Sequence, residues 1–282
     1  MKSLFIFTVS LAILSTVLVR PSPAGEAQNA FNEGVKYHRA GKLKEAISAY
    51  DRAIKADPKA AEAYNNRGLA YYKLGRNDEA VKDYDAALKI NSKLTDGYYN
   101  RANAYFVQKQ YDHAIKDYDE VIKQNPKFTR AYNQRGQAYY NLSQYEKAIQ
   151  DFNQSQKLNP KDPEVYYSRG LAERRLGKND LAVRDYTESI KLNSKNAEVF
   201  NNRANAYSLL GKYDEALKDY DQAIKLDPKN ARIYVNRGVI KVRQEKTEDA
   251  EKDFKKAIEL DPSLKEKIEP LLGEQKPSPA KK

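Results

Sequence analysis

The sequence predicts an all-α protein made of seven tandem copies of one 34-residue helical hairpin, and three observations support this. The segment Asn-Arg-Gly-Leu-Ala-Tyr at 66–71 returns in closely similar form at 100–105, 134–139 and 202–207. Small and aromatic residues recur within each copy at helical spacing, and Gly and Pro recur where helices should turn and stop. Seven blocks then follow one another without insertion or deletion: 27–60, 61–94, 95–128, 129–162, 163–196, 197–230 and 231–264.

Each block is numbered here from position 1 to position 34. Positions 4, 8 and 11 share one face of a first helix, and positions 20, 24 and 27 share one face of a second. Position 8 is always Gly or Ala, position 20 is always Ala, and position 24 is always Tyr or Phe. We expect the small residues to let the two backbones approach and the aromatic ring to fill the space between them. The tyrosines that recur at position 11 are expected to belong to the same core.

Glycine and proline mark the ends of these helices. Position 15 is glycine in four blocks, where a left-handed cap at the end of the first helix suits that residue: Gly41, Gly75, Gly177 and Gly211. Position 32 is proline in five blocks, where it stops the second helix. One such hairpin cannot bury its own apolar face, so neighbouring hairpins must stack.

This set of columns resembles the tetratricopeptide repeat (TPR) family, and the resemblance covers 238 of the 282 residues. It implies a right-handed superhelical solenoid with a concave face, in which seven repeats make close to one superhelical turn. It also implies a scaffold that binds proteins. Beyond the last block, residues 265–272 are expected to form a short cap and residues 273–282 a disordered tail.

A charged pair recurs in register with the repeat. Position 7 is arginine and position 23 is aspartate in blocks two to seven, whereas block one has Glu33 and Ala49. In a hairpin that turns near position 16, these positions lie at similar heights on facing helices. We therefore expect an Arg–Asp ion pair inside six repeats, with a structural role, and expect the first repeat to lack it.

The composition argues against catalysis, metal binding and nucleic-acid binding. The chain has no cysteine, and its two histidines, His38 and His113, have no partners at catalytic spacing. It contains no phosphate-binding loop, nucleophile elbow or metal-ligand cluster. Of the net charge of +11, residues 25–264 carry +7, and they mix 43 basic with 36 acidic residues. The expectation is a protein without enzymatic activity, cofactor, metal or small-molecule substrate.

The first 24 residues have the form of a secretory signal. Met1 and Lys2 precede an uncharged, mostly apolar run at 4–19, and small residues then allow cleavage after Ala24. We expect export to the periplasm or the outside of the cell. The alternative is an uncleaved membrane anchor formed by residues 4–19, although that run is shorter than most membrane spans.

In TPR proteins the concave groove is lined by positions 2, 5, 6, 9, 12 and 13, so the resemblance implies a peptide site here. Carboxamides recur at position 6 and could pair with the donors and acceptors of a peptide backbone. Ser168 interrupts this column, and the family's lysine clamp at position 5 is absent. The predicted site comprises Asn32, Asn66, Asn100, Gln134, Asn202 and Asn236 at position 6, Asn103 and Asn205 at position 9, Tyr72, Phe106 and Tyr140 at position 12, and Arg175 at position 13.

Two alternatives remain open at this point. The position-6 amides can simply solvate the groove or cap nearby backbone. The protein can also be a structural or assembly component of an envelope complex, self-associating or binding through its convex face or the ends of the array. Light scattering with and without residues 234–272 separates assembly from peptide binding, and the sequence does not identify the partner.

Overall fold

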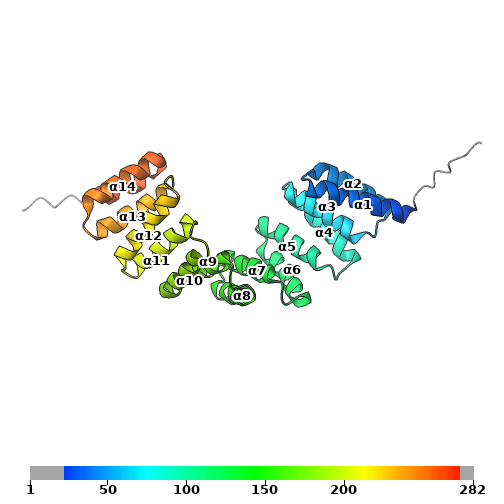
Figure 1. Cartoon of the computed structure of the whole chain (residues 1–282), viewed down its shortest axis with the longest axis horizontal. Coiled ribbons are helices and arrows are strands. Elements are labelled where there is room, and N and C mark those ends of the chain that lie inside the picture. Colours follow the sequence, from blue (N-terminus) through cyan, green and yellow to red (C-terminus); the bar gives the residue numbers. More distant parts are fainter. Residues whose placement is uncertain (1–21, 274–282) are drawn as a thin grey trace, which may run out of the picture. The chain divides into compact units, whose positions relative to one another are not determined.

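The computed structural model describes residues 22–273 and divides at Ser92–Lys93 into two compact units (Figure 1). Within the described residues all regular structure is helical. Most of the expected signal (1–21) and of the expected tail (274–282) lies outside the described residues.

The N-terminal unit holds the first two repeats as two helical hairpins. Helices α1 and α2 pack against each other, as do α3 and α4, and α2 also packs on α3. The short turns make the two helices of each hairpin antiparallel. The helices are α1 (Pro23–Arg39), α2 (Leu43–Ala56), α3 (Ala61–Lys73) and α4 (Asn77–Ile90).

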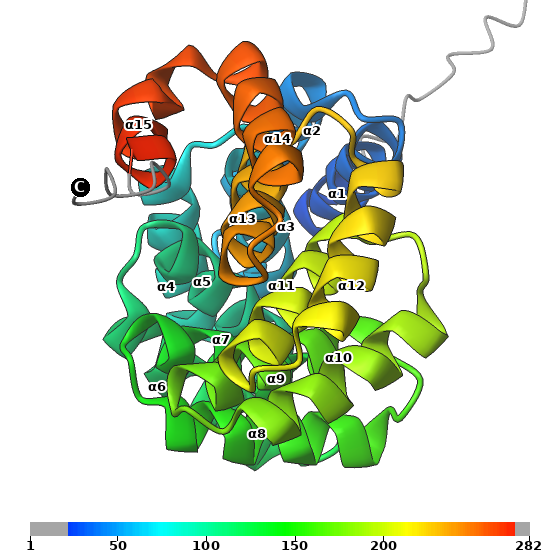
Figure 2. The same cartoon turned by 90° about the vertical axis from the view of Figure 1, so that its left-hand side faces the viewer.

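The C-terminal unit continues the pattern through five hairpins and a terminal helix (Figure 2). The first helix of each hairpin contacts the first helix of the next, from α5 to α13, so these helices form one continuous layer of the unit. The elements are α5 (Thr95–Val107), α6 (Tyr111–Gln124), α7 (Thr129–Asn141), α8 (Tyr145–Leu158), α9 (Pro163–Arg175), α10 (Asn179–Leu192), α11 (Ala197–Leu209), α12 (Tyr213–Leu226), α13 (Ala231–Arg243), α14 (Thr247–Leu260), the 3₁₀ turn η1 (Pro262–Leu264) and α15 (Lys265–Gly273).

Position 15 ends the first helix in the left-handed conformation, as predicted. Gly75 has φ +75°, and the other three glycines at this position are similar. The remaining repeats place Lys109, Ser143 and Glu245 in the same conformation, with φ near +60°. Since that conformation costs a residue with a side chain about 1–2 kcal/mol, the turn geometry is imposed by packing of the hairpin and not by glycine alone.

The aromatic ring at position 24 forms the centre of each hairpin. Tyr84 is completely buried, as are its equivalents, and Ala80 at position 20 lies beneath it with no exposed surface. A Cβ atom on Gly68 would lie 2.8 Å from Cε1 of Tyr84. Position 8 therefore stays small because the ring occupies the space that a side chain would need, which confirms the predicted core.

The Arg–Asp pair is present in repeats two to seven. Arg67 donates from Nε and Nη2 to the two carboxylate oxygens of Asp83, at 2.8 and 2.6 Å. Its Nη1 donates to Asp51 of the preceding repeat at 2.5 Å. The same two-bond pairing joins Arg101 to Asp117, Arg135 to Asp151, Arg169 to Asp185, Arg203 to Asp219 and Arg237 to Asp253.

The tyrosines at position 11 pack on the core, as predicted, and also cover the position-7 arginine. They are half-buried, and those of repeats three, four and six pack against buried hydrophobic clusters. The guanidinium of Arg67 lies 5.9 Å from the ring of Tyr71 and 5.5 Å from that of Tyr64 at position 4. Repeats five and seven replace this tyrosine by Glu173 and Lys241. The tyrosine thus shields an ion pair from water at the edge of the core.

The first and the last repeat are stabilised by different contacts. The first repeat lacks the internal Arg–Asp pair, as expected. Glu33 at position 7 instead forms an ion pair with Arg52 on the surface, at 2.7 Å. After the last repeat, Ile268 of α15 is buried in the same cluster as Phe254 and Ala250. Helix α15 therefore covers the apolar side of the final hairpin.

The hydroxyl of the central tyrosine has two different environments. Tyr118 and Tyr220 donate to Asn103 and Asn205 at position 9 of the same repeat, both at 2.6 Å. The hydroxyl of Tyr84 is buried with no hydrogen-bond partner among the described residues. A buried hydroxyl without a partner carries a desolvation penalty, whereas a satisfied one makes a net favourable contribution.

Replacing these tyrosines by phenylalanine should therefore have opposite effects. Tyr220→Phe is expected to cost about 0.5–1.5 kcal/mol because it removes a bond and leaves Asn205 without its donor. Tyr84→Phe is expected to leave stability unchanged or to increase it. Urea unfolding of the two variants measures both effects, and equal destabilisation would contradict the environments described above.

Candidate functional site

Three hydrogen bonds join consecutive first helices across one face of the C-terminal unit. Each connects residues that are 35 apart in the sequence: Asn202 Nδ2 to the hydroxyl of Tyr167 (3.1 Å), Asn236 Nδ2 to Oδ1 of Asn201 (3.1 Å) and Arg175 Nε to the hydroxyl of Tyr140 (3.2 Å). The bonds lie between positions 5 and 6 or between positions 12 and 13. We call the residues at positions 5, 6, 12 and 13 of α5, α7, α9, α11 and α13 the first-helix face.

The side-chain amides of Asn202 and Asn236 at position 6 are oriented by hydrogen bonds that their nitrogen atoms donate. Asn202 donates to Tyr167 and also to the backbone oxygen of Glu198 at 3.0 Å, and Asn236 donates to Asn201. Their carbonyl oxygens form no hydrogen bond among residues 22–273. The amides thus do cap local backbone, as the open alternative proposed, yet each keeps a fixed acceptor on the first-helix face.

A polar cavity of about 490 Å³ lies beside the middle of this column. Oδ1 of Asn133, at position 5, is buried and has no hydrogen-bond partner within the described part of the chain. The predicted residue Gln134 lines the same cavity. The lining comprises Tyr99, Thr129, Arg130, Asn133, Gln134, Ser155, Asn159 and Asp162.

A second cavity recurs two repeats further along the same unit, with a volume of about 580 Å³. Asn201 at position 5 and Glu198 at position 2 line it, together with Asn230 and Arg232. Hollows beside positions 2 and 5 therefore recur along the unit, and both offer amide groups and charges of both signs.

The predicted position-9 residues are partly committed to the hairpin core. Asn103 and Asn205 accept the hydroxyl hydrogen of the central tyrosine, a role that the sequence analysis did not foresee. Their NH₂ groups are not used in these bonds. In repeats three and six, Asn at position 9 occurs together with Tyr at position 24, and this pairing in the sequence could have predicted the hydrogen bond.

The predicted aromatics at position 12 pack against the start of the second helix of their own repeat. The ring of Phe106 meets Tyr111 edge-on at 5.3 Å, and Tyr140 meets Tyr145 at 5.4 Å. Tyr72, Asn66 and the exposed Asn32 belong to the N-terminal unit, and Asn100 is half-buried in the C-terminal unit. The predicted residues therefore fall on two units, each described by itself.

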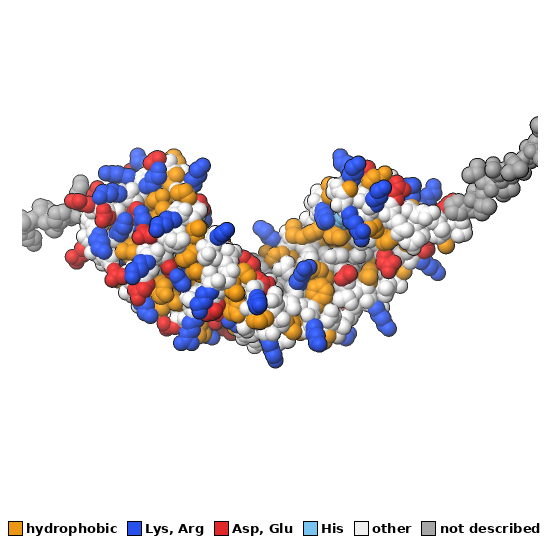
Figure 3. Space-filling model, viewed as in Figure 1, with side chains coloured by type: hydrophobic (Ala, Val, Ile, Leu, Met, Phe, Trp, Pro, Cys, Tyr) orange, Lys and Arg blue, Asp and Glu red, His pale blue; other side chains and the backbone are white. Residues whose placement is uncertain are grey.

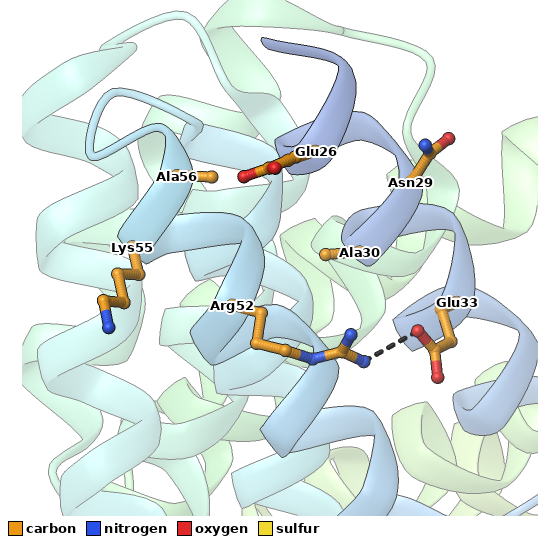
Figure 4. Close-up of a pocket in the computed structure, with 7 residues that line it drawn as sticks. All are labelled: Glu26, Asn29, Ala30, Glu33, Arg52, Lys55 and Ala56. Carbon is orange, nitrogen blue, oxygen red and sulfur yellow. Dashed lines mark hydrogen bonds and ion pairs between the residues drawn. The ribbon is translucent and has the colours of Figure 1, made fainter. Parts of the chain in front are cut away.

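The outer face of the first repeat is open (Figure 4). A cavity of about 560 Å³ lies there between α1 and α2, where later repeats contact the hairpin before them. Ala30 occupies position 4, which is aromatic in the other six repeats, and the Arg52–Glu33 pair crosses the cavity.

His, Asp and Glu residues are scattered over residues 22–273. No group of three or more His, Asp or Glu residues is placed to hold a metal ion there, and no helix in that range is long and apolar enough to cross a membrane. On the face shown in Figure 3, basic and acidic side chains are interspersed. His38 is half-buried, which lowers its pKa, and His113 lies against the ring of Tyr105.

The pattern of paired helices can now be compared with known proteins. Residues 59–270 match the family described as the Cilia and flagella-associated protein 70 C-terminal domain, and residues 34–75 match the TPR repeat family. The chain belongs to the tetratricopeptide repeat family. TPR proteins are scaffolds for protein–protein interactions. No curated protein matches this one.

Solved structures share the TPR fold. A TPR protein from Parabacteroides merdae ATCC 43184 is 27% identical, with a TM-score of 0.65 over 88% of this chain and 98% of the other. The MamA protein is 25% identical, with a TM-score of 0.57 over 61% and 94% of the two chains. YrrB, described as a TPR protein with an unusual peptide-binding site, is 21% identical, with a TM-score of 0.59 over 71% and 99%. At that identity the likeness to YrrB concerns the fold alone.

Glu173 was not singled out from the sequence, although it interrupts the tyrosine column at position 11. It is buried, and its Oε2 has no hydrogen-bond partner within residues 22–273. Burial, and then repulsion from Asp185, raise the pKa of Glu173 to about 7, against the attraction of Arg169. Up to about pH 7, Glu173 therefore retains a proton beside the Arg169–Asp185 pair.

This pKa predicts a pH-dependent contribution to stability. Between pH 4.5 and about 7 the unfolded chain loses the proton of Glu173 while the folded chain retains it, so this residue lowers stability as pH rises and by a constant amount above pH 7. Glu173→Gln should be more stable than the natural protein at pH 8, on the order of 1 kcal/mol, and nearly equal at pH 4.5. Melting curves at both pH values measure this, with the exposed Glu146→Gln as control. A difference independent of pH would refute it.

Proposed function

We propose that this TPR protein is a non-enzymatic adaptor that binds an extended segment of a partner protein on the first-helix face of its C-terminal unit. The polar cavity lined by Asn133 and Gln134, at positions 5 and 6 of the first-helix face, is the observation that carries this proposal. An extended peptide offers backbone N–H and C=O groups at regular intervals, and side-chain amides can pair with both kinds of group.

Fixed acceptors further along the unit support the same function. The oriented carbonyl oxygens of Asn202 and Asn236 lie on α11 and α13, two and three repeats after the cavity-lining residues Asn133 and Gln134 of α7. The half-buried rings of Phe106 and Tyr140 lie at position 12 of α5 and α7, where side chains of a bound segment can pack. No bound metal or cofactor is needed for this recognition.

Removing the amides beside the cavity should weaken peptide binding without unfolding the protein. The double substitution Asn133→Ala and Gln134→Ala avoids the amides that cross-link helices, and should lower affinity by about tenfold, as expected for the loss of one or two hydrogen bonds. Peptides are first selected from a displayed random library, and binding is measured by fluorescence polarisation. Gln150→Ala, exposed on α8, is the matched control. Unchanged affinity in the double variant contradicts this site.

We also propose that the protein is exported, with residues 1–24 acting as a cleaved signal. The basic start, the apolar run and the small residues before Gly25 support this. Expression of the full chain in a Gram-negative bacterium should give a periplasmic protein that begins at Gly25, as measured by intact mass. A full-length mass in the membrane fraction would instead favour the anchor, and a full-length cytoplasmic protein would contradict export.

A further inference from the structure

The cavity on the outer face of the first repeat lies where the other repeats carry an aromatic ring. In repeats two to seven, the ring at position 4 lies 5.5–5.7 Å from the guanidinium of the arginine at position 7 of the same repeat. Ala30 replaces the ring in repeat one and lines the cavity. The six rings belong to Tyr64, Tyr98, Tyr132, Tyr166, Phe200 and Tyr234.

The last repeat shows which part of the hairpin a position-4 ring covers. Tyr234 belongs to one buried cluster with Phe254 of the second helix, α14. Glu259, and to a smaller degree Tyr234, raise the pKa of Lys256, which occupies position 26 of the same helix. The ring therefore lies on the side of the hairpin where position 26 is found. In repeat one this position is Arg52, and it lines the cavity together with Ala30.

The first repeat keeps a guanidinium at this place, although it comes from the other helix. Arg52 of α2 donates from Nη2 to Oε2 of Glu33, which occupies position 7, at 2.7 Å. Both residues line the cavity, and their ion pair crosses it (Figure 4). The side chain of Arg52 is 57% exposed, so a partner can reach it. The repeat thus retains the cation that a position-4 ring covers elsewhere, but lacks the ring.

The rest of this outer face is not suited to a whole additional hairpin. Ile233, at position 3 of repeat seven, is buried in one cluster with Tyr220 of repeat six. Asn29 takes that position in repeat one and is exposed, and the charged side chains of Glu26 and Lys55 also line the cavity. Covering these polar groups with a helix carries a desolvation penalty, whereas one side chain can enter between them.

From this arrangement we propose that the cavity binds the side chain of a tyrosine or phenylalanine that a partner protein presents. The ring packs on Ala30 and Ala56 and lies over the guanidinium of Arg52, as position-4 rings lie over the arginine at position 7. An aromatic ring buries a large apolar area, and its face attracts a cation. This contact lies in the N-terminal unit, so it goes beyond the proposed function and does not rest on it.

The alanine methyl groups of the cavity allow a direct test by NMR. The protein is labelled with ¹³C at its alanine methyl groups, and the signals of Ala30 and Ala56 are assigned from the variants Ala30→Ser and Ala56→Ser. The probes are N-acetyltyrosinamide and N-acetylleucinamide. The tyrosine probe should shift both signals in a saturable way, with an affinity about fivefold higher than that of the leucine probe, because only the ring interacts with the guanidinium.

Two variants test the two parts of the site. Ala30→Tyr supplies the chain's own ring and should abolish binding of the tyrosine probe, with the Ala56 signal as the readout. Arg52→Gln changes an exposed residue and should lower the affinity for the tyrosine probe to that for the leucine probe. Ser48→Tyr, which adds a ring on an exposed part of α2, is the matched control and should bind normally. Circular dichroism melting checks that each variant is folded.

Four results would overturn this inference. Neither probe shifts the two signals, the leucine probe binds as tightly as the tyrosine probe, or folded Ala30→Tyr still binds the ring. In the fourth, the same signals shift when the protein is concentrated without any probe, which assigns the cavity to a second copy of this chain. Loss of peptide binding on the first-helix face, by contrast, affects the proposed function alone.

Discussion

In repeats two to seven, an arginine of the first helix forms an ion pair with a buried aspartate of the second helix. The aspartate side chains are only 5–8% exposed, and burial raises the pKa of Asp83 and Asp151 even with arginine in contact. A carboxylate in such a place needs a partner, because removing one member of a buried pair leaves an uncompensated charge that costs about 3–5 kcal/mol. The pair therefore fixes which turns of the two helices face each other. Through its third bond, as from Arg67 to Asp51, it also fixes how one hairpin sits on the next.

The location of the candidate site follows from that constraint. With 3.6 residues per turn, the positions that follow the arginine around the inner side of the first helix are 4, 8 and 11, and these carry the rings and the small residues. Positions 2, 5, 6, 9, 12 and 13 fall on the opposite side, where the hairpin constrains the residue type less, although Asn103 and Asn205 at position 9 are bonded to the core. The residue types at positions 6 and 13, where Asn202, Asn236 and Arg175 lie, can consequently differ between repeats while the pairing of the helices stays the same. The bonds that they make to the neighbouring first helix use one end of each side chain and leave the other end available.

The sequence was sufficient for the parts of the fold that recur in every block. The hairpin boundaries, the ring at position 24 and the Arg–Asp pair all appear as columns with an evident physical purpose. Features that depend on context were harder to predict. Lys109, Ser143 and Glu245 adopt the left-handed conformation because the turn demands it, although their residue types do not favour it. The column of tyrosines at position 11 predicted core residues, but not that a ring such as Tyr71 also covers the guanidinium of Arg67. The candidate site was predicted as a set of positions, but Asn103 and Asn205 proved to be bonded to core tyrosines, since a buried hydroxyl takes the nearest acceptor.

In a repeat protein, a residue that differs from its equivalents in the other repeats points to function only if the structure does not use it for packing. Lys241 departs from the tyrosine column at position 11, yet it pairs with Asp253 at 2.8 Å, so it serves the hairpin. Glu33 departs at position 7 and pairs with Arg52. Repeat five differs because Glu173, its departure at position 11, is buried beside the Arg169–Asp185 pair, with no hydrogen-bond partner for its Oε2 within residues 22–273. A buried polar atom without a partner lowers stability. This departure therefore weakens the hairpin that holds it, and packing does not explain it.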